Sequence, residues 1–254
     1  MSNPVLETKN LGIDFGGLTA VNKLNIYINE KEIVGLIGPN GAGKTTVFNL
    51  LTKVYEPTRG NVLLCGNNTK KMNSIEANRN GIARTFQNIR LFNNLSVEDN
   101  IKVAMNNIYS YSIFDTIFHT KKRYNQERKI EEETTKLLEI FNLSNFRYTK
   151  ASSLPYGDQR KLEIARALAT NPKVLLLDEP AAGMNPQETA ELLNTIRFVR
   201  DKFGICILLI EHDMSLVMNI CERIYVLNYG TLLAKGSPEE IKNNQDVIKA
   251  YLGD

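Results

Sequence analysis

The sequence predicts an α/β fold in which a nucleotide-binding core carries a β-rich N-terminal part and a helical insertion. A complete phosphate-binding loop, G-x-x-x-x-G-K-[ST], spans residues 38–45, after an apolar run at 33–37 and before a helical pattern at 46–51. That strand–loop–helix context is what the motif requires. Further apolar runs follow downstream, and Gly and Pro are scarce between residues 90 and 154, which favours helices there.

The N-terminal part is expected to be β-rich with one helix. Apolar and polar residues alternate at Val5–Glu7 and Leu24–Ile28, as in half-buried strands. Ile33–Ile37 is apolar throughout and leads to the phosphate-binding loop. A turn at Pro57–Gly60 introduces a further short strand at Val62–Leu64.

A helical subdomain is expected after about Arg84. Ser96 is placed to cap a helix at Val97–Met105, which has acidic residues in its first turn. Apolar residues recur at helical spacing within Glu127–Asn142.

The α/β core then resumes. Val174–Leu177, Ile205–Ile210 and Ile224–Leu227 are apolar without alternation, as expected for parallel strands covered on both faces. An amphipathic helix is expected at Gln187–Lys202, between the first two of these strands. The order strand–helix–strand implies right-handed crossovers in one sheet.

Composition limits the functional classes. The chain has 254 residues and a net charge of +3, which is too small to indicate nucleic-acid binding by itself. The three cysteines, Cys65, Cys206 and Cys221, lie among apolar neighbours and are expected to be buried free thiols in a reducing compartment. We expect no signal peptide at Met1–Asn10 and no membrane-spanning helix, so work at a membrane would go through partners.

The phosphate-binding loop carries the clearest chemistry. Its glycines let backbone N–H groups point at phosphates, Lys44 adds a cation, and the Thr45 hydroxyl can bind Mg²⁺. The predicted ATP-binding residues of this loop and of the helix start are Gly38, Asn40, Gly41, Ala42, Gly43, Lys44, Thr45 and Thr46.

Two carboxylates end the strand at Val174–Leu177. A strand ending beside the phosphate-binding loop would place Asp178 near Mg²⁺. Glu179, one residue further on, would orient the attacking water or accept its proton. The alternative is an ordinary strand end with an acidic helix cap.

One amide side chain and one imidazole side chain are weaker candidates for the nucleotide site. Gln87 lies where the α/β part gives way to the helical part and can touch Mg²⁺ or water, although an isolated Gln is usually a surface residue. His212 follows the strand Ile205–Ile210 and could hydrogen-bond the γ-phosphate, although an isolated His is usually structural. No chemistry is expected from His119.

Two further segments indicate nucleotide binding. Leu154–Arg160 precedes a helix at Lys161–Thr170 and is typical of a second phosphate-binding helix N-terminus. It is too far along the chain to belong to the first loop, which suggests head-to-tail pairing of two such chains. Phe15 could stack on adenine or could be an ordinary core residue.

Taken together, these segments resemble the ATP-binding cassette (ABC) family. In family terms they are an aromatic A-loop at Phe15, Walker A at 38–45, a Q-loop at Gln87, a signature at 154–158, Walker B at 174–179, a D-loop at 182–185 and an H-loop at His212. The longer motifs and the tail at 233–253 look like the ATP-binding subunit of branched-chain amino-acid importers.

The resemblance implies a P-loop NTPase of the ABC ATPase fold, with an N-terminal antiparallel β-subdomain and an inserted helical subdomain. Residues 1–254 would form one domain, with a core at 1–87 and 166–232, a helical subdomain at 88–165 and a C-terminal tail at 233–254. It assigns catalysis to Glu179 and His212, and Mg²⁺ binding to Thr45, Gln87 and Asp178. Nucleotide contacts beyond the loop would come from Phe15, Gln87, Leu154, Tyr156, Gly157 and Asp158.

The family also implies partners. The chain would be a peripheral subunit on the cytoplasmic face of the membrane, pairing with a second ATP-binding subunit and two membrane-spanning permeases, with an external solute-binding protein and no nucleic acid. Other interpretations are the motor of another transporter, for urea or lipopolysaccharide, a soluble ABC ATPase of translation or repair, and a degenerate regulatory subunit.

Two departures from the general family pattern affect the predicted nucleotide sites. Pro155 replaces the signature Ser and offers neither a hydroxyl nor an N–H, so the site completed by this signature is expected to be weakened. Asn185 replaces the D-loop Asp. The aromatic and basic segment Asn106–Tyr124 is either a contact for permease or lipid, or a solvated helical insertion.

Overall fold

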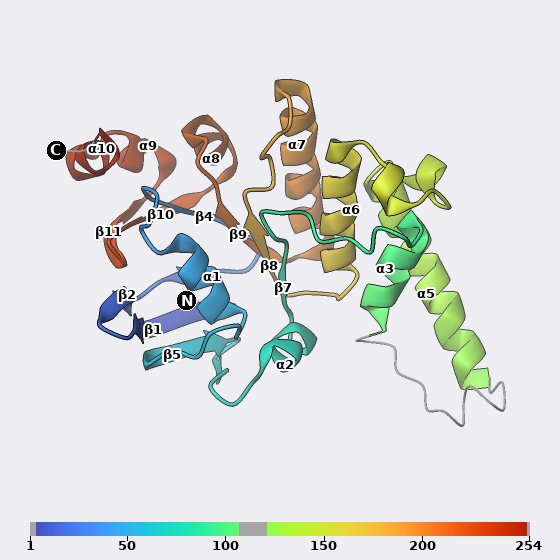
Figure 1. Cartoon of the computed structure of the whole chain (residues 1–254), viewed down its shortest axis with the longest axis horizontal. Coiled ribbons are helices and arrows are strands. Elements are labelled where there is room, and N and C mark those ends of the chain that lie inside the picture. The colour runs from blue at the N-terminus through green and yellow to red at the C-terminus, as the bar shows by residue number, and fades with distance from the viewer. Residues whose placement is uncertain (1–3, 107–120, 253–254) are drawn as a thin grey trace.

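The computed structural model describes residues 4–106 and 121–252, which form two β-sheets with helices packed around them (Figure 1). Most of the segment Asn106–Tyr124, including His119, lies outside the described residues.

The larger sheet has six strands in the order β11-β10-β4-β9-β8-β7. All neighbouring strands are parallel except β10 and β11, which are antiparallel. The strands are β4 (Ile33–Ile37), β7 (Ile82–Arg84), β8 (Val174–Asp178), β9 (Cys206–Ile210), β10 (Arg223–Asn228) and β11 (Thr231–Gly236). The prediction of parallel strands from unalternating apolar runs is confirmed.

These runs are apolar throughout because both faces of the sheet are covered. Val34 and Leu36 of β4 pack on one side with α1 (Lys44–Leu51) and the smaller sheet. Ile33 and Ile37 pack on the other side with α7 (Pro186–Phe203) and α8 (Met214–Ile220). Figure 1 shows this layering, with α7 and α8 above the sheet and α1 below it.

The smaller sheet is antiparallel and consists of β1 (Leu6–Phe15), β2 (Leu18–Leu24), β3 (Tyr27–Ile28), β5 (Arg59–Leu64) and β6 (Asn67–Asn68). The single strand predicted at Leu24–Ile28 is wrong, because β2 ends at Leu24 and β3 begins at Tyr27. Lys23 has a positive φ of 46°, and the Asn25 side chain accepts a hydrogen bond from the Asn10 amide at 2.8 Å. This local bend interrupts the strand between Leu24 and Tyr27.

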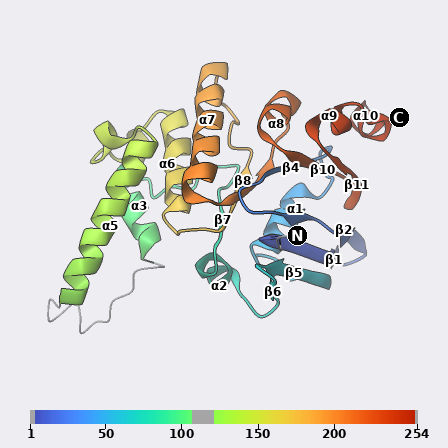
Figure 2. The ribbon, with the colours of Figure 1, turned by 180° about the vertical axis from the view of Figure 1, so that it is seen from behind.

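The helices of the inserted part gather at one end of the molecule, away from β1 and β2 (Figures 1 and 2). They are α3 (Val97–Met105), α5 (Lys121–Ile140) and α6 (Tyr156–Leu168), with 3-10 turns at Ser144–Phe146 and Ala151–Ser153. Ser96 caps α3, as predicted, by accepting a hydrogen bond from the Asp99 amide at 3.0 Å. The predicted subdomain boundary at residue 165 falls inside α6, which begins five residues before the predicted start at Lys161.

Several elements were not predicted. α2 (Ser74–Arg79) begins with a capping box between Asn73 and Glu76 and leads into β7. The tail after β11 forms α9 (Pro238–Lys242) and α10 (Gln245–Leu252). Among the helices of the described residues, none combines the length and apolar character needed to cross a membrane.

The cysteine prediction holds for two of the three residues. Cys206 and Cys221 are buried free thiols. Cys65 is exposed, which corrects the prediction, because it lies in the turn between β5 and β6 with a positive φ of 48°. Apolar neighbours in the sequence do not ensure burial at a turn.

Candidate nucleotide site

The site lies at one edge of the larger sheet. In parallel strands the carboxyl ends meet at the same edge, so the loops after β4, β9 and β8 come together there. Together with residue 87, these loops line a pocket of about 330 Å³. Its lining residues are Asn40, Gly41, Ala42, Gly43, Lys44, Thr45, Thr46, Gln87, Glu179 and His212. Ten of the predicted site residues are thus brought together.

The phosphate-binding loop needs glycine at two of its positions. Gly38 has a φ of 153°, and a Cβ there would lie 2.2 Å from the Leu227 carbonyl oxygen. Gly43 has a φ of 100°, and a Cβ there would lie 2.8 Å from the Ala20 carbonyl oxygen. Because Gly43 caps α1 without a side-chain bond, the first amides of this helix are left for an anion.

Lys44 is held inside this loop. Its ammonium donates hydrogen bonds to the carbonyl oxygens of Gly38 at 2.7 Å and Pro39 at 3.0 Å. Burial lowers the pKa of Lys44, and the charges of Glu179 and Asp178 act in the opposite direction. The ammonium therefore sits among acceptors at the place where phosphate oxygens would enter.

Glu179 is the centre of the polar cluster opposite the loop. Its Oε1 lies 2.7 Å from His212 Nε2, and its Oε2 accepts a hydrogen bond from Gln87 Nε2 at 2.8 Å. The backbone of Glu179 has a positive φ of 47°, an unfavourable conformation for a residue with a side chain, and its N–H donates to the Ile210 carbonyl at 2.9 Å. This turn directs the carboxylate toward β9 and His212.

Asp178 does not line the pocket. It is buried at the end of β8, where it accepts a hydrogen bond from the Arg84 guanidinium at 2.7 Å. Arg84 also donates to the Asn49 side chain at 2.6 Å and lies between the rings of Phe48 and Phe86. The sequence analysis missed Arg84, which holds Asp178 beside the candidate site. The signal for it was a charged residue at the end of the short apolar strand Ile82–Arg84.

The loop that carries His212 is supported by carboxylates on either side. Glu211 is buried and accepts hydrogen bonds from the amides of Ala181 at 3.0 Å and His212 at 3.3 Å. Burial raises the pKa of Glu211. Asp213 caps α8, and its hydrogen bond with Ser215 lowers its pKa. The Glu211 side chain thus holds the His212 amide, and Asp213 fixes the start of the helix that follows.

Phe15 lies at the end of β1, and the residue is 44% exposed. It packs edge to face against Tyr55, with ring centroids 5.3 Å apart. The exposed ring excludes the interpretation of Phe15 as an ordinary core residue. Its contact with adenine remains a prediction.

The signature segment lies apart from this pocket. Of the described residues, those at 154–158 do not contribute to its lining. α6 begins after Pro155, which provides no side-chain cap, so its first amides are unpaired by a capping side chain. Asp158 forms an ion pair with Lys161 at 3.3 Å. Their contact with a nucleotide remains a prediction that requires a second chain.

The D-loop contacts the signature. The Tyr156 ring lies 3.2 Å from the position that a Cβ on Gly183 would occupy. Asn185 caps α7 in a capping box with Glu188, so this residue has a clear local role as a helix cap.

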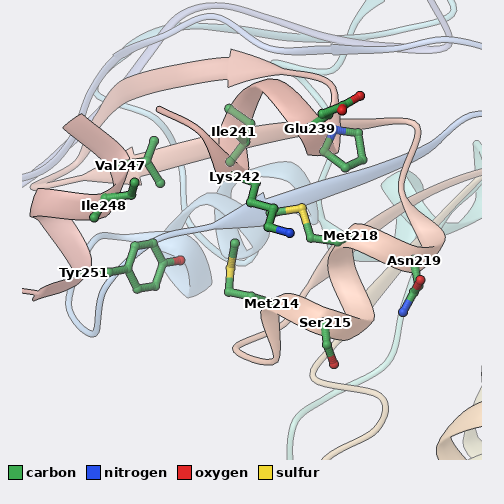
Figure 3. A pocket seen from close by; sticks show the side chains of 11 residues that line it. Met214, Ser215, Met218, Asn219, Glu239, Ile241, Lys242, Val247, Ile248 and Tyr251 are labelled. Carbon is green, nitrogen blue, oxygen red and sulfur yellow. The ribbon is translucent and has the colours of Figure 1, made fainter. Parts of the chain in front are cut away.

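A second, more apolar pocket of about 680 Å³ lies between α8 and the tail helices α9 and α10 (Figure 3). Figure 3 shows Met214 and Met218 of α8 facing Ile241 and Val247 of the tail. The tail thus packs on the helix that directly follows His212.

A phosphate-binding loop facing a carboxylate and an imidazole at the carboxyl edge of a parallel sheet defines a P-loop ATPase. The family described as "ABC transporter" matches residues 21–182, and the family described as "Branched-chain amino acid ATP-binding cassette transporter" matches residues 231–254. The chain belongs to the ABC transporter family and, within it, to the branched-chain amino acid transport ATP-binding proteins.

The relatives match over the full length. The chain is 47% identical to the high-affinity branched-chain amino acid transport ATP-binding protein BraF of Pseudomonas aeruginosa and 48% identical to LivG of Escherichia coli, covering 100% of each protein and of this chain. It is 34% identical to the lipopolysaccharide export system ATP-binding protein LptB of Escherichia coli, over 98% of this chain and 97% of LptB.

Solved structures confirm the predicted fold. A crystal structure of a nucleotide-free ATP-binding cassette from an ABC transporter is 31% identical, with a TM-score of 0.84, and covers 99% of this chain and 100% of that chain. The chain is therefore an ATPase of the ABC type.

Proposed function

We propose that this chain hydrolyses ATP to drive an importer of branched-chain amino acids. The convergence of Glu179, His212 and Gln87 over a complete phosphate-binding loop supports ATP hydrolysis. The similarity to BraF and LivG along the whole chain supports branched-chain amino acids as the transported solute, as does the family match at residues 231–254.

ATP phosphates fit the loop because two glycines bring the backbone close, and the uncapped start of α1 provides amides. Lys44 would exchange the carbonyls of Gly38 and Pro39 for phosphate oxygens. Glu179 would accept the proton of the attacking water, with Gln87 and His212 fixing the direction of its carboxylate. His212 would then hydrogen-bond the γ-phosphate.

A divalent cation suits the oxygen donors here. Thr45, Gln87 and Asp178 would hold Mg²⁺, which when bound neutralises phosphate charge. Thr45 and Gln87 line the pocket, whereas Asp178 would act from beneath it, after exchange of its contact with Arg84 or through a water.

A second ATP-binding subunit would complete each nucleotide site. The start of α6, with Leu154, Tyr156, Gly157 and Asp158, would cap the nucleotide held by the partner's loop, and Phe15 would stack on the adenine of this chain's own nucleotide. The position of residues 154–158 outside the pocket supports such pairing. Two permeases, with a solute-binding protein outside, would complete a transporter that this chain joins on the cytoplasmic face of the membrane.

The test is isolation of the tagged full chain from solubilised membranes, followed by transport assays with the reconstituted partners. The expected result is co-purification of two permeases and a second cassette protein, and ATP-dependent uptake of leucine, isoleucine or valine. Co-purification of partners that move lipopolysaccharide, which the similarity to LptB allows, would contradict the proposal that the solute is a branched-chain amino acid. Ribosomal or DNA-repair partners without membrane subunits would contradict transport altogether.

A further inference from the structure

Helix α6 buries a charged pair that the proposed reaction does not use. Arg160 and Glu163 are one turn apart, 0% and 1% exposed, and joined at 2.9 Å. Burying two charges is costly unless further hydrogen bonds satisfy them. The contacts of this pair therefore indicate what it is for.

Both side chains bind the backbone of the segment that carries Gln87. Arg160 donates hydrogen bonds to the carbonyl oxygens of Phe86 at 2.7 Å and Gln87 at 2.8 Å. Glu163 Oε1 accepts from the amides of Arg90 at 3.1 Å and Phe86 at 3.4 Å. Residues 86–90 lie between β7 and α3, outside any described helix or strand, so these bonds replace a regular ladder.

The same guanidinium reaches the signature. Arg160 Nη2 lies 3.4 Å from the Tyr156 hydroxyl, and Tyr156 packs against Gly183 of the D-loop. Gln87, whose carbonyl Arg160 holds, contacts Glu179 through its side chain. The buried Arg160 side chain thus links residues 86–90, which carry Gln87 into the pocket, to the signature end of α6.

We propose that Arg160 and Glu163 are positioning residues that fix residues 86–90 to α6, so that Gln87 keeps its contact with Glu179 and moves together with the signature end of the helix. This inference rests on the proposed function. It implies that the two residues act on the rate of hydrolysis and leave the binding of ATP at the loop unaffected.

The residue types suit this role. A guanidinium donates in several fixed directions, which allows Arg160 to hold two carbonyls and a carboxylate at once, and an ammonium on a flexible chain does so poorly. Burial raises the pKa of Glu163, and its bonds with Arg90 and Arg160 oppose that effect.

A double variant separates positioning from stability. Arg160→Met alone would leave a buried carboxylate without its partner, which is destabilising. Arg160→Met combined with Glu163→Gln removes both charges, and the Gln oxygen still accepts from the amides of Phe86 and Arg90. The carbonyls of Phe86 and Gln87 lose their donor, so the Arg160 part of the positioning contact is lost while the methionine side chain still fills the core.

The experiment compares the wild-type full chain, the double variant, Arg160→Lys, and Arg128→Met as a matched control on the exposed surface of α5. It measures ATP affinity, kcat, KM, the thermal midpoint and amide exchange of residues 85–92. In the double variant we expect ATP affinity within about twofold, kcat lower by about tenfold or more, and faster exchange at 85–92 with β9 unchanged. The kcat and the exchange at 85–92 of Arg160→Lys should lie between those of the double variant and the wild type. Arg128→Met should match the wild type in both.

An unchanged kcat in the double variant would overturn the proposal, as would a loss of ATP affinity in proportion to the loss of kcat, or unchanged exchange at 85–92. A wild-type chain that does not hydrolyse ATP even when it is combined with its partner cassette subunit would instead contradict the proposed function. In that case the exchange data would still decide whether Arg160 and Glu163 hold residues 86–90.

Discussion

Glu179 shows how a single residue joins the parts of the site. Its carboxylate touches one side chain from the loop after β9 and one from the segment after β7. Each contact is made by a different oxygen, so His212 and Gln87 together fix the plane of the carboxylate. Under the proposed function, a base held in this way would need little reorganisation before it accepts a proton.

Glu179→Gln is expected to keep ATP binding and to lower steady-state hydrolysis by about 10²-fold or more, because the amide cannot accept the proton of water. Phosphate release measures the rate, and size-exclusion chromatography with ATP should detect a stalled closed dimer. Glu132→Gln, an exposed change on α5, is the control. Unchanged turnover in Glu179→Gln would contradict the assignment of the base.

Burial predicts the reactivity of the three thiols. Burial raises the pKa of Cys206 to about 12 and also raises the pKa of Cys221, so neither forms a thiolate at pH 8. In the native chain we expect a disulfide reagent at pH 8 to titrate Cys65 alone, and to titrate all three thiols in denaturant. Reaction of a second thiol in the folded chain would show that the packing around β9 or α8 is looser than described.

Sequence predicted best those site residues whose placement depends on local chain geometry. The loop at 38–45, Glu179 and His212 each follow a buried strand, and parallel strands bring such positions together. Arg84, Arg160 and Glu163 were given no role, because their contacts with Asp178, Gln87 and Arg90 join residues that are 73 to 94 positions apart in the chain. No local pattern encodes such contacts.

At the scale of elements, burial on both faces made the central strands predictable. α2 and β11 were missed because they are short or half-exposed, so their patterns are weak. The helix predicted at Lys161–Thr170 starts earlier, at Tyr156, because Pro155 is compatible with a helix N-terminus.

The tail helices allow a matched test of packing. Ile241 of α9 is 1% exposed, whereas Ile248 of α10 is 37% exposed. Ile241→Ala should lower the free energy of unfolding by about 2–4 kcal/mol, because it leaves a cavity against α8. Ile248→Ala should lower it by no more than about 1 kcal/mol. Urea unfolding measures both, and equal effects would contradict the described packing of the tail.

At the scale of the whole molecule, the proposed function assigns two separate nucleotide-binding features to one chain. The loop at 38–45 and the start of α6 do not share a pocket. Under the proposed function, each would be completed by a second chain. A change at the signature should therefore act on the partner's nucleotide and leave this chain's own affinity for ATP unchanged.

Pro155→Ser is expected to strengthen ATP-dependent pairing. It restores a hydroxyl at the N-cap of α6, and a hydrogen bond to a charged phosphate contributes about 1.5–3 kcal/mol, or roughly tenfold or more in dimer affinity. The dimer fraction against chain concentration, at saturating ATP and in the Glu179→Gln background, measures this. Binding of ATP by the separate chain should not change, and unaltered pairing would contradict a signature contact with phosphate.

The left-handed backbone at Glu179 has a consequence for any attempt to improve this protein. Glycine adopts a φ of 47° without the steric cost that a side chain adds, so Glu179→Gly would relieve about 1 kcal/mol of strain. A screen that rewards heat resistance alone would therefore favour loss of the carboxylate that we propose as the base of ATP hydrolysis. The residue remains Glu only where selection acts on the work that the protein performs.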